Sequence, residues 1–240
     1  MRPARAFALV LFVVSTIPAT SAHAHQLATR TSAKGLQPPI VWKRIPFGHT
    51  RKRQTAAYSD RHYGDRSWHL VDPPVIVEHY TDGDSWQSAW NYFAANAAHL
   101  GEHPGVCSHF IVDTDGTIYQ LVNLKIRCRH TIGLNDRAIG IEMVGTSDAQ
   151  ILHRTREIRA ALDLTLWLVA RFGIQVRNVI GHAESLMSPY HHERYPSWRC
   201  LTHSDWLHPD MRTFRRKLKR LARRNEVPIG PKPEWVHRDC

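Results

Sequence analysis

The chain has 240 residues, which is enough for one domain with a full hydrophobic core and extensions at its ends. Its formal net charge is +11, and this charge is unevenly distributed. Residues 25–70 and 212–240 each carry a net charge of +7, whereas residues 71–211 carry a net charge of −5. An acidic central region argues against a nucleic-acid-binding module, so we expect no nucleic-acid partner.

The first 24 residues have the features of a cleaved secretion signal. Arg2 and Arg5 precede an apolar run over residues 6–14, and residues 22–24 supply the small side chains that flank a cleavage site. The apolar run is shorter than the roughly 20 residues that span a bilayer, which favours a cleaved signal over a membrane anchor. We therefore expect an exported protein, either periplasmic or secreted.

The next segment, residues 25–70, is polar and basic and has no sustained apolar period. It is predicted to be an extension of the domain and not a second domain. The pattern changes at residue 71. Residues 75–77 form a short β-branched run that leads to His79 and predicts a buried strand. Asp84 and Ser85 offer caps for a helix over residues 86–99.

The middle of the chain predicts a β-hairpin and a further strand. Residues 110–112 and 118–121 are apolar runs, and Asp115 and Gly116 between them supply a turn. Residues 139–143 form another strand candidate. Four cysteines are present, and Cys107 and Cys128 lie on either side of the hairpin, so we expect a disulfide between these two, with other pairings as the alternative.

Two helices and a strand complete the predicted elements. Apolar residues recur every three to four positions over residues 155–172, and Gly173 can end that helix. A short strand follows at residues 179–180, and a basic helix at residues 210–224. Strands and helices alternate around one core, which predicts an α/β single domain with a central mixed β-sheet flanked by helices.

Three residues lie at positions where such a fold can place catalytic or metal-binding side chains. His79 and His182 each follow a predicted strand, and Glu142 lies inside an apolar strand, where a carboxylate is costly unless it is paired or functional. Two neutral imidazoles with one carboxylate or thiolate make a catalytic zinc site that keeps a position open for water. Each residue alone is typical of a structural role, but the three together predict a site.

Several ordered motifs resemble the N-acetylmuramoyl-L-alanine amidase type 2 family, which is related to peptidoglycan recognition proteins and T7-type lysozyme. The resemblance extends over about residues 72–220 and is carried by residues 75–81, 108–120, 129–133, 139–142 and 181–182. It implies a mixed sheet with helices around it, and a groove with one Zn²⁺ that accepts glycan and stem peptide.

The resemblance also implies roles for individual residues. His79 and His182 correspond to the two histidine ligands of zinc, and Glu142 to the catalytic glutamate. His130 corresponds to a groove histidine that lies beside the substrate without binding the metal.

The third ligand is predicted to be Asp205, with His203 as the group that polarises the scissile carbonyl. The family places an Asp or Cys about ten residues after the second histidine, and the longer stretch here breaks that spacing. Four other residues therefore remain candidates: Cys200, His191, His192 and Glu193.

The implied function is zinc-dependent hydrolysis of the amide between N-acetylmuramic acid and L-alanine in peptidoglycan or muropeptides. A peptidoglycan-binding receptor without turnover, on the same fold, is the alternative. The predicted organisation is a signal peptide at residues 1–24, a basic N-terminal extension at 25–70, a zinc amidase domain at 71–224 and a C-terminal tail at 225–240.

The basic helix has two interpretations. Its apolar residues recur at helical spacing and are expected to dock it on the domain: Met211, Phe214, Leu218 and Leu221. Its arginines, Arg215 among them, would then cover the exposed side. They could hold the protein on the anionic cell envelope, or they could form an ordinary solvated face.

Overall fold

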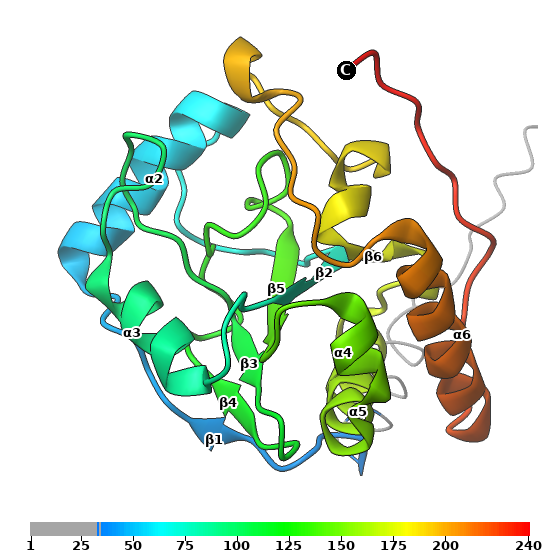
Figure 1. Ribbon diagram of the computed structural model, residues 1–240. Coiled ribbons are helices and arrows are strands. Elements are labelled where there is room, and N and C mark those ends of the chain that lie inside the picture. Colours follow the sequence, from blue (N-terminus) through cyan, green and yellow to red (C-terminus); the bar gives the residue numbers. More distant parts are fainter. Residues whose placement is uncertain (1–32, 34) are drawn as a thin grey trace, which may run out of the picture.

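A six-stranded sheet forms the centre of the computed structural model, which describes residue 33 and residues 35–240 (Figure 1). The expected signal peptide lies outside the described residues. The strands are β1 (Val41–Trp42), β2 (Val75–Tyr80), β3 (Phe110–Val112), β4 (Ile118–Gln120), β5 (Ala138–Met143) and β6 (Val179–Gly181). Their order is β1-β4-β3-β5-β2-β6, and only the β3–β4 pair is antiparallel among these strands. The predicted mixed sheet is confirmed.

Helices cover both faces of this sheet. They are α2 (His49–Tyr63), α3 (Trp86–Ala95), α4 (Asp148–His153), α5 (Thr155–Phe172) and α6 (His208–Arg224), with 3₁₀ turns η1 (Val176–Asn178), η2 (His182–Met187) and η3 (Pro196–Trp198). Helices α2 and α3 lie on one side of the sheet, and α4, α5 and α6 lie together on the other (Figure 1). None of the described helices is long and apolar enough to cross a membrane.

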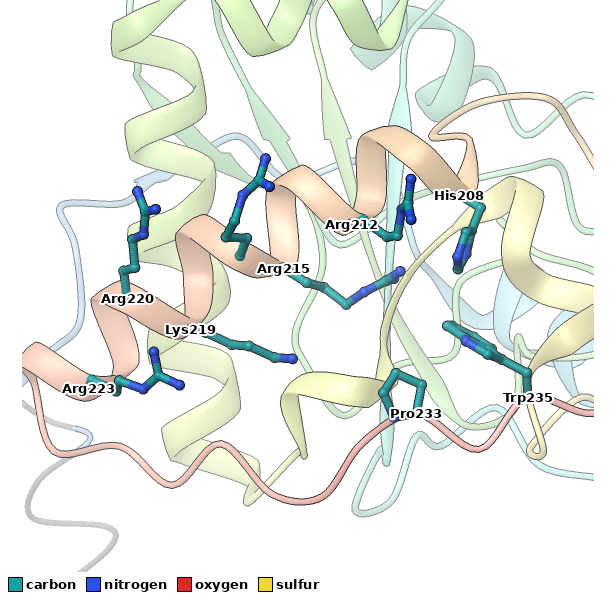
Figure 2. Close-up of a pocket in the computed structure, with 9 residues that line it drawn as sticks. His208, Arg212, Arg215, Lys219, Arg220, Arg223, Pro233 and Trp235 are labelled. Atoms are coloured by element: carbon teal, nitrogen blue, oxygen red, sulfur yellow. The ribbon is translucent and has the colours of Figure 1, made fainter.

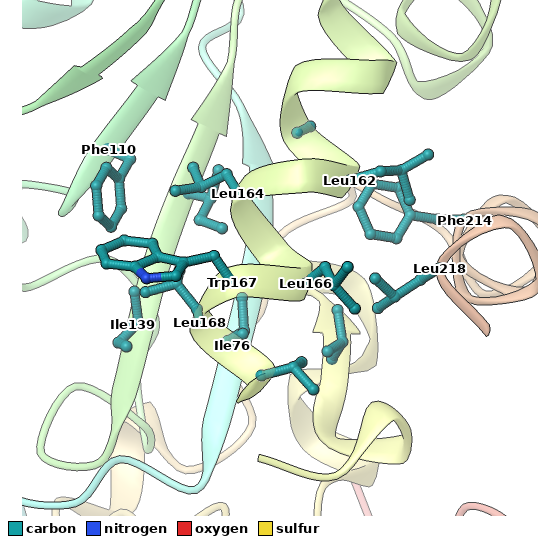
Figure 3. Packing of buried hydrophobic residues seen from close by; sticks show 14 of the residues in the cluster. Ile76, Phe110, Ile139, Leu162, Leu164, Leu166, Trp167, Leu168, Phe214 and Leu218 are labelled. Carbon is teal, nitrogen blue, oxygen red and sulfur yellow. The ribbon is translucent and has the colours of Figure 1, made fainter. Parts of the chain in front are cut away.

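The larger core lies between the sheet and α5. Because successive side chains of a strand point to opposite faces, Ile139 and Ile141 of β5 face α5, where the ring of Trp167 packs against Phe110 at a centroid distance of 6.5 Å (Figure 3). The same alternation turns Glu142 to the opposite face. The pleat of β5 therefore places Glu142 on the face opposite the core beneath α5.

The sequence predicts that residues 25–70 are an extension outside the domain. The structure corrects this prediction for the part from β1 onward, which belongs to the fold. Val41 and Trp42 pair with β4 at the sheet edge, and α2 packs on the domain. The buried face of α2 has helical spacing but consists largely of polar and aromatic residues: Arg51, Thr55, Tyr58, Ser59 and His62. A search for apolar periodicity could not find such a helix.

Arg51 shows how this polar face is accommodated. Its buried guanidinium donates to the carbonyl oxygens of Phe93 at 2.7 Å, Val106 at 3.0 Å and Gly105 at 3.2 Å. Hydrogen bonds to backbone oxygens pair the two terminal nitrogens of the guanidinium in the interior and tie α2 to α3 and the following loop.

Two disulfides use all four cysteines. The predicted bond between Cys107 and Cys128 is confirmed, with the two Cα atoms 5.2 Å apart. Cys200 pairs with Cys240, with a Cα separation of 5.5 Å, and so fixes the C-terminal tail. This second bond removes Cys200 from the candidate metal ligands, because its sulfur is not available as a thiolate.

Helix α6 docks through Met211, Phe214 and Leu218, as its sequence predicts; Phe214 and Leu218 are seen in Figure 3. The expectation that Arg215 belongs to the exposed basic side is wrong. Arg215 is only 4% exposed, and its Nη2 donates to Glu184 Oε1 at 2.8 Å.

Replacing Arg215 should therefore destabilise the fold. Arg215→Gln leaves Glu184 buried without its charge partner, and we expect a loss of about 3 kcal/mol in the free energy of unfolding. Arg216→Gln, one position further on the exposed side, should change it by less than about 0.5 kcal/mol. Urea denaturation of both variants measures the difference, and similar losses would contradict the structural role of Arg215.

Glu157 is a second buried carboxyl group, in the first turn of α5. Burial raises its pKa to about 7, although Arg154 Nη1 lies 3.3 Å from its Oε2. Because its pKa in the unfolded chain is lower, its contribution to stability is full below about pH 4.5 and is lost as the pH rises through about 7.

Glu157→Gln cannot ionise and should remove this pH dependence. Relative to wild type, we expect the variant to gain about 2 kcal/mol in unfolding free energy between pH 4.5 and pH 8. Urea denaturation across this pH range tests the expectation, with the exposed Glu226→Gln as control. A stability difference that does not change with pH would rule it out.

Candidate active site

The candidate site lies at the carboxyl ends of three neighbouring parallel strands. His79 of β2 stands opposite Glu142 of β5 in the register, and His182 directly follows β6 on the other side of β2. Carboxyl ends of parallel strands meet at one edge of a sheet, which is where α/β folds collect reactive groups. The fold thus brings together three residues that are far apart in the sequence.

Asp205 joins this group from the loop before α6. Its Oδ2 lies 3.0 Å from His79 Nδ1, and its Oδ1 lies 3.2 Å from His182 Nδ1. One potential ligand atom from each of His79, His182 and Asp205 lies within 4.8 Å of the others. Among the described residues, this is the group of histidines and carboxylates that could hold a metal ion.

The loop that carries Asp205 is fixed on both sides. The Ala183 N–H donates to the backbone oxygen of Asp205 at 2.9 Å, and the Trp206 indole donates to the oxygen of His79 at 3.1 Å. Gly181 permits this approach, because a Cβ there would lie 2.0 Å from the Trp206 oxygen. The Asp148 carboxylate accepts the Trp206 N–H at 2.8 Å. No sequence signal identified the role of Asp148.

The charges of the cluster follow from its contacts. Burial lowers the pKa of His79 and so favours the neutral imidazole. Burial would raise the pKa of Asp205, but hydrogen bonds with His182, His203 and His79 hold it below its usual range. The group therefore offers two imidazoles and an ionised carboxylate, which is the donor set of a catalytic zinc site with three protein ligands.

Glu142 lines the same cavity but lies outside the three-residue group. Its side chain is almost fully buried, and burial, with the negative charge of Asp205 in addition, raises its pKa well above the usual range. A carboxyl group with a raised pKa is a stronger base than an ordinary carboxylate and can both accept and return a proton.

Two further histidines border the cluster. His130 Nδ1 lies 3.1 Å from His79 Nε2, so this predicted groove residue lies both at the cavity wall and against His79. The more exposed His203 has its Nδ1 2.9 Å from Asp205 Oδ1, and this hydrogen bond raises its pKa. His203 therefore presents a ring that favours the protonated form at the mouth of the site.

The cavity has a volume of about 520 Å³ and is open to solvent. Besides the cluster, its walls come from the end of β2 and the segment after it, from α3 and from the loop before β3: Tyr80, Thr81, Ser85, Tyr92, His99 and Val106. This volume lies within the range of sites that hold small organic ligands.

The other candidates for the third ligand lie elsewhere. The carboxylate of Glu193 is bound to His62 Nδ1 at 2.9 Å, and His191 packs against Gly133. His192 donates its backbone N–H to the oxygen of Gly133 at 2.8 Å. The structure thus places Asp205 beside the two histidines, and none of the three alternatives lies there.

Comparison with known proteins identifies the family of this chain. Residues 69–195 match the family described as N-acetylmuramoyl-L-alanine amidase, a match that spans more than half of the chain and includes His79, Glu142 and His182. The chain belongs to this family. The amidase carries Asp205 and His203 beyond the matched segment. No curated protein matches it.

Several solved structures are similar to the amidase. LysCS, an endolysin N-acetylmuramoyl-L-alanine amidase from Clostridium intestinale URNW, shares 21% identity over 58% of this chain and 78% of that chain, with a TM-score of 0.40. Drosophila PGRP-LB shares 16% identity over 61% and 83%, with a TM-score of 0.43. AmiD from E. coli, in complex with anhydro-N-acetylmuramic acid-L-Ala-D-gamma-Glu-L-Lys, shares 24% over 48% and 50%, with a TM-score of 0.39.

Proposed function

We propose that this amidase hydrolyses the bond between N-acetylmuramic acid and L-alanine in peptidoglycan or muropeptides by a zinc-dependent mechanism. One observation carries the proposal: His79, His182 and Asp205 converge at one edge of the sheet, beside Glu142 and in an open cavity. A pure receptor would not need a buried carboxyl group of raised pKa next to such a cluster.

His79, His182 and Asp205 would hold one zinc ion. The donor set fits, because it consists of two imidazoles and a carboxylate whose charge is maintained in the protein interior. When bound, zinc would polarise the scissile carbonyl and lower the pKa of water from about 15.7 to near 7. His130 would keep the ring of His79 in position through its 3.1 Å contact.

Glu142 and His203 would act on the substrate itself. Glu142 would take a proton from the attacking water and transfer it to the leaving amine of L-alanine, and its raised pKa makes it a stronger base than an ordinary carboxylate. His203, whose pKa is raised by its hydrogen bond with Asp205, would donate to the oxyanion that develops on the carbonyl oxygen. Such a donor typically contributes about 2.7–4 kcal/mol to catalysis.

We also infer that the protein works outside the cytoplasm, in the periplasm or as a secreted enzyme. The two disulfides support this, because such bonds persist in oxidising compartments. Peptidoglycan lies in the same location and would be accessible to the cavity.

Asp205→Ala tests the metal site. We expect wild type to bind one zinc ion per chain and the variant to bind it at least about 100-fold more weakly, because one of three protein ligands is lost. Zinc titration against a competing chelator measures both affinities. Glu142→Gln is the control and should retain the wild-type affinity. Full affinity in Asp205→Ala would show that Asp205 is not a ligand.

Glu142→Gln tests the chemistry separately. An amide cannot accept a proton from water, so turnover should fall by about 10²–10⁴-fold while the zinc content and the melting temperature stay near wild type. Mass spectrometry of muropeptide products gives the rate. Turnover within a few-fold of wild type would remove Glu142 from the mechanism, and zinc-loaded wild-type protein that binds muropeptides without cleaving them would favour the receptor.

A further inference from the structure

A second cavity, of about 560 Å³, lies away from the candidate active site, between α6 and the C-terminal tail (Figure 2). Helix α6 supplies one wall and the tail supplies the other, so we call this cavity the α6–tail groove. Its lining residues are His208, Arg212, Arg215, Arg216, Lys219, Arg220, Arg223, Pro233 and Trp235. Seven of the nine are basic or histidine residues.

The tail wall is held in a defined position. The Cys200–Cys240 disulfide fixes its end, the Val236 N–H donates to the oxygen of Met187 at 2.9 Å, and the Arg238 guanidinium donates to the oxygen of Leu186 at 2.6 Å. The groove is therefore part of the folded structure and not a gap beside a loose terminus.

The floor of the groove is also ordered. The Trp235 ring lies 5.3 Å from the guanidinium of Arg215 and 5.6 Å from the ring of His208. Glu184, which is fully buried, accepts hydrogen bonds from both Arg215 and His208. Glu184 thus neutralises Arg215 and leaves the other cations of the groove without that partner.

Five cations of the groove have no carboxylate within 4.0 Å in the part of the chain that the structure describes. They are Arg212, Arg216, Lys219, Arg220 and Arg223. The carboxylate of Glu234, on the tail wall, pairs with Arg177 instead. Like charges three and four residues apart on a helix repel one another, so an anion in the groove would relieve this repulsion.

The cations form a row along α6. From Arg212 to Arg223 the helix advances about 16 Å at 1.5 Å per residue. A guanidinium group binds phosphate oxygens through paired N–H donors, and four of the five cations are arginines. The row therefore fits an extended chain of phosphates better than a single small anion.

We propose that the α6–tail groove binds the phosphate groups of a linear polyanion that carries no bases. A lipid bilayer fits less well, because the groove is concave and no Leu, Ile, Val, Met or Phe is among its lining residues. Single-stranded nucleic acid fits less well, because such sites stack successive bases on several aromatic rings and this groove has only Trp235 and the half-exposed His208. The proposal does not rest on the proposed zinc chemistry.

The test uses two double variants of the full-length protein with the same charge change. Arg216→Gln with Arg220→Gln removes two cations from the groove. Lys217→Gln with Arg224→Gln removes two exposed cations of the same helix that do not line it. We expect long-chain inorganic polyphosphate, measured by titration calorimetry, to bind the groove variant about tenfold more weakly than wild type, a change of about 1.4 kcal/mol. The control variant should bind within about twofold of wild type.

A third variant tests the geometry of the groove. Cys200→Ser with Cys240→Ser releases the end of the tail wall without changing a charge. We expect polyphosphate affinity to fall several-fold while the helical circular dichroism stays unchanged. Equal losses in the two charge variants, or full affinity in the cysteine variant, would overturn the proposal, because charge alone would then explain binding.

Two competing ligands complete the experiment. A single-stranded oligonucleotide and vesicles that contain anionic phospholipid should both bind more weakly than polyphosphate at matched phosphate concentration. Tighter binding of either one overturns the proposal in favour of a nucleic-acid or a membrane surface. Muropeptide turnover by the groove variant should stay at the wild-type rate, so that failure here and failure of the amidase mechanism can be told apart.

Discussion

The carboxylate of Asp205 carries a buried negative charge between His79 and His182, with His203 at its outer edge. A buried charge is costly unless it is paired, so the loop that carries Asp205 must be held accurately against the strand ends. That requirement explains the surrounding contacts. Asp148 binds the backbone of Trp206, Trp206 binds the backbone of His79, and Gly181 leaves room for the close approach.

Helix α6 connects this site with the second feature of the molecule. It starts three residues after Asp205, and its Arg215 is bound to Glu184, which lies two residues after His182. The Glu184 carboxylate also accepts the N–H of Gly181 at 3.1 Å. One buried ion pair therefore fixes both the turn that presents His182 and the helix that forms one wall of the α6–tail groove. Five other cations of α6 face that groove: Arg212, Arg216, Lys219, Arg220 and Arg223.

Parts of the fold that have a strong apolar period could be predicted from the sequence. Helix α5 runs from Thr155 to Phe172 as its spacing indicates, and β2, β5 and the β3–β4 hairpin lie where their apolar runs predict. The sequence does not predict helix α2, because the buried face of this helix is polar. Its polar side chains find distant partners, as the guanidinium of Arg51 does with the backbone oxygen of Phe93. Strand β1 was missed because a strand of two residues has no period to detect.

The sequence by itself determined the family, through ordered motifs around His79, Glu142 and His182, and it determined that these residues end or occupy separate strands. Only the tertiary structure decided which residue stands with the two histidines. The sequence favours Asp205 and leaves Glu193 and Cys200 among the alternatives, because distance from His182 along the chain says little about position in space. Packing settled the choice: Cys200 is bonded to the tail, Glu193 is bound to His62, and Asp205 is held between the imidazoles. The same reason applies to Arg215, which looks like its exposed neighbours in sequence and is buried only because Glu184 lies beneath it.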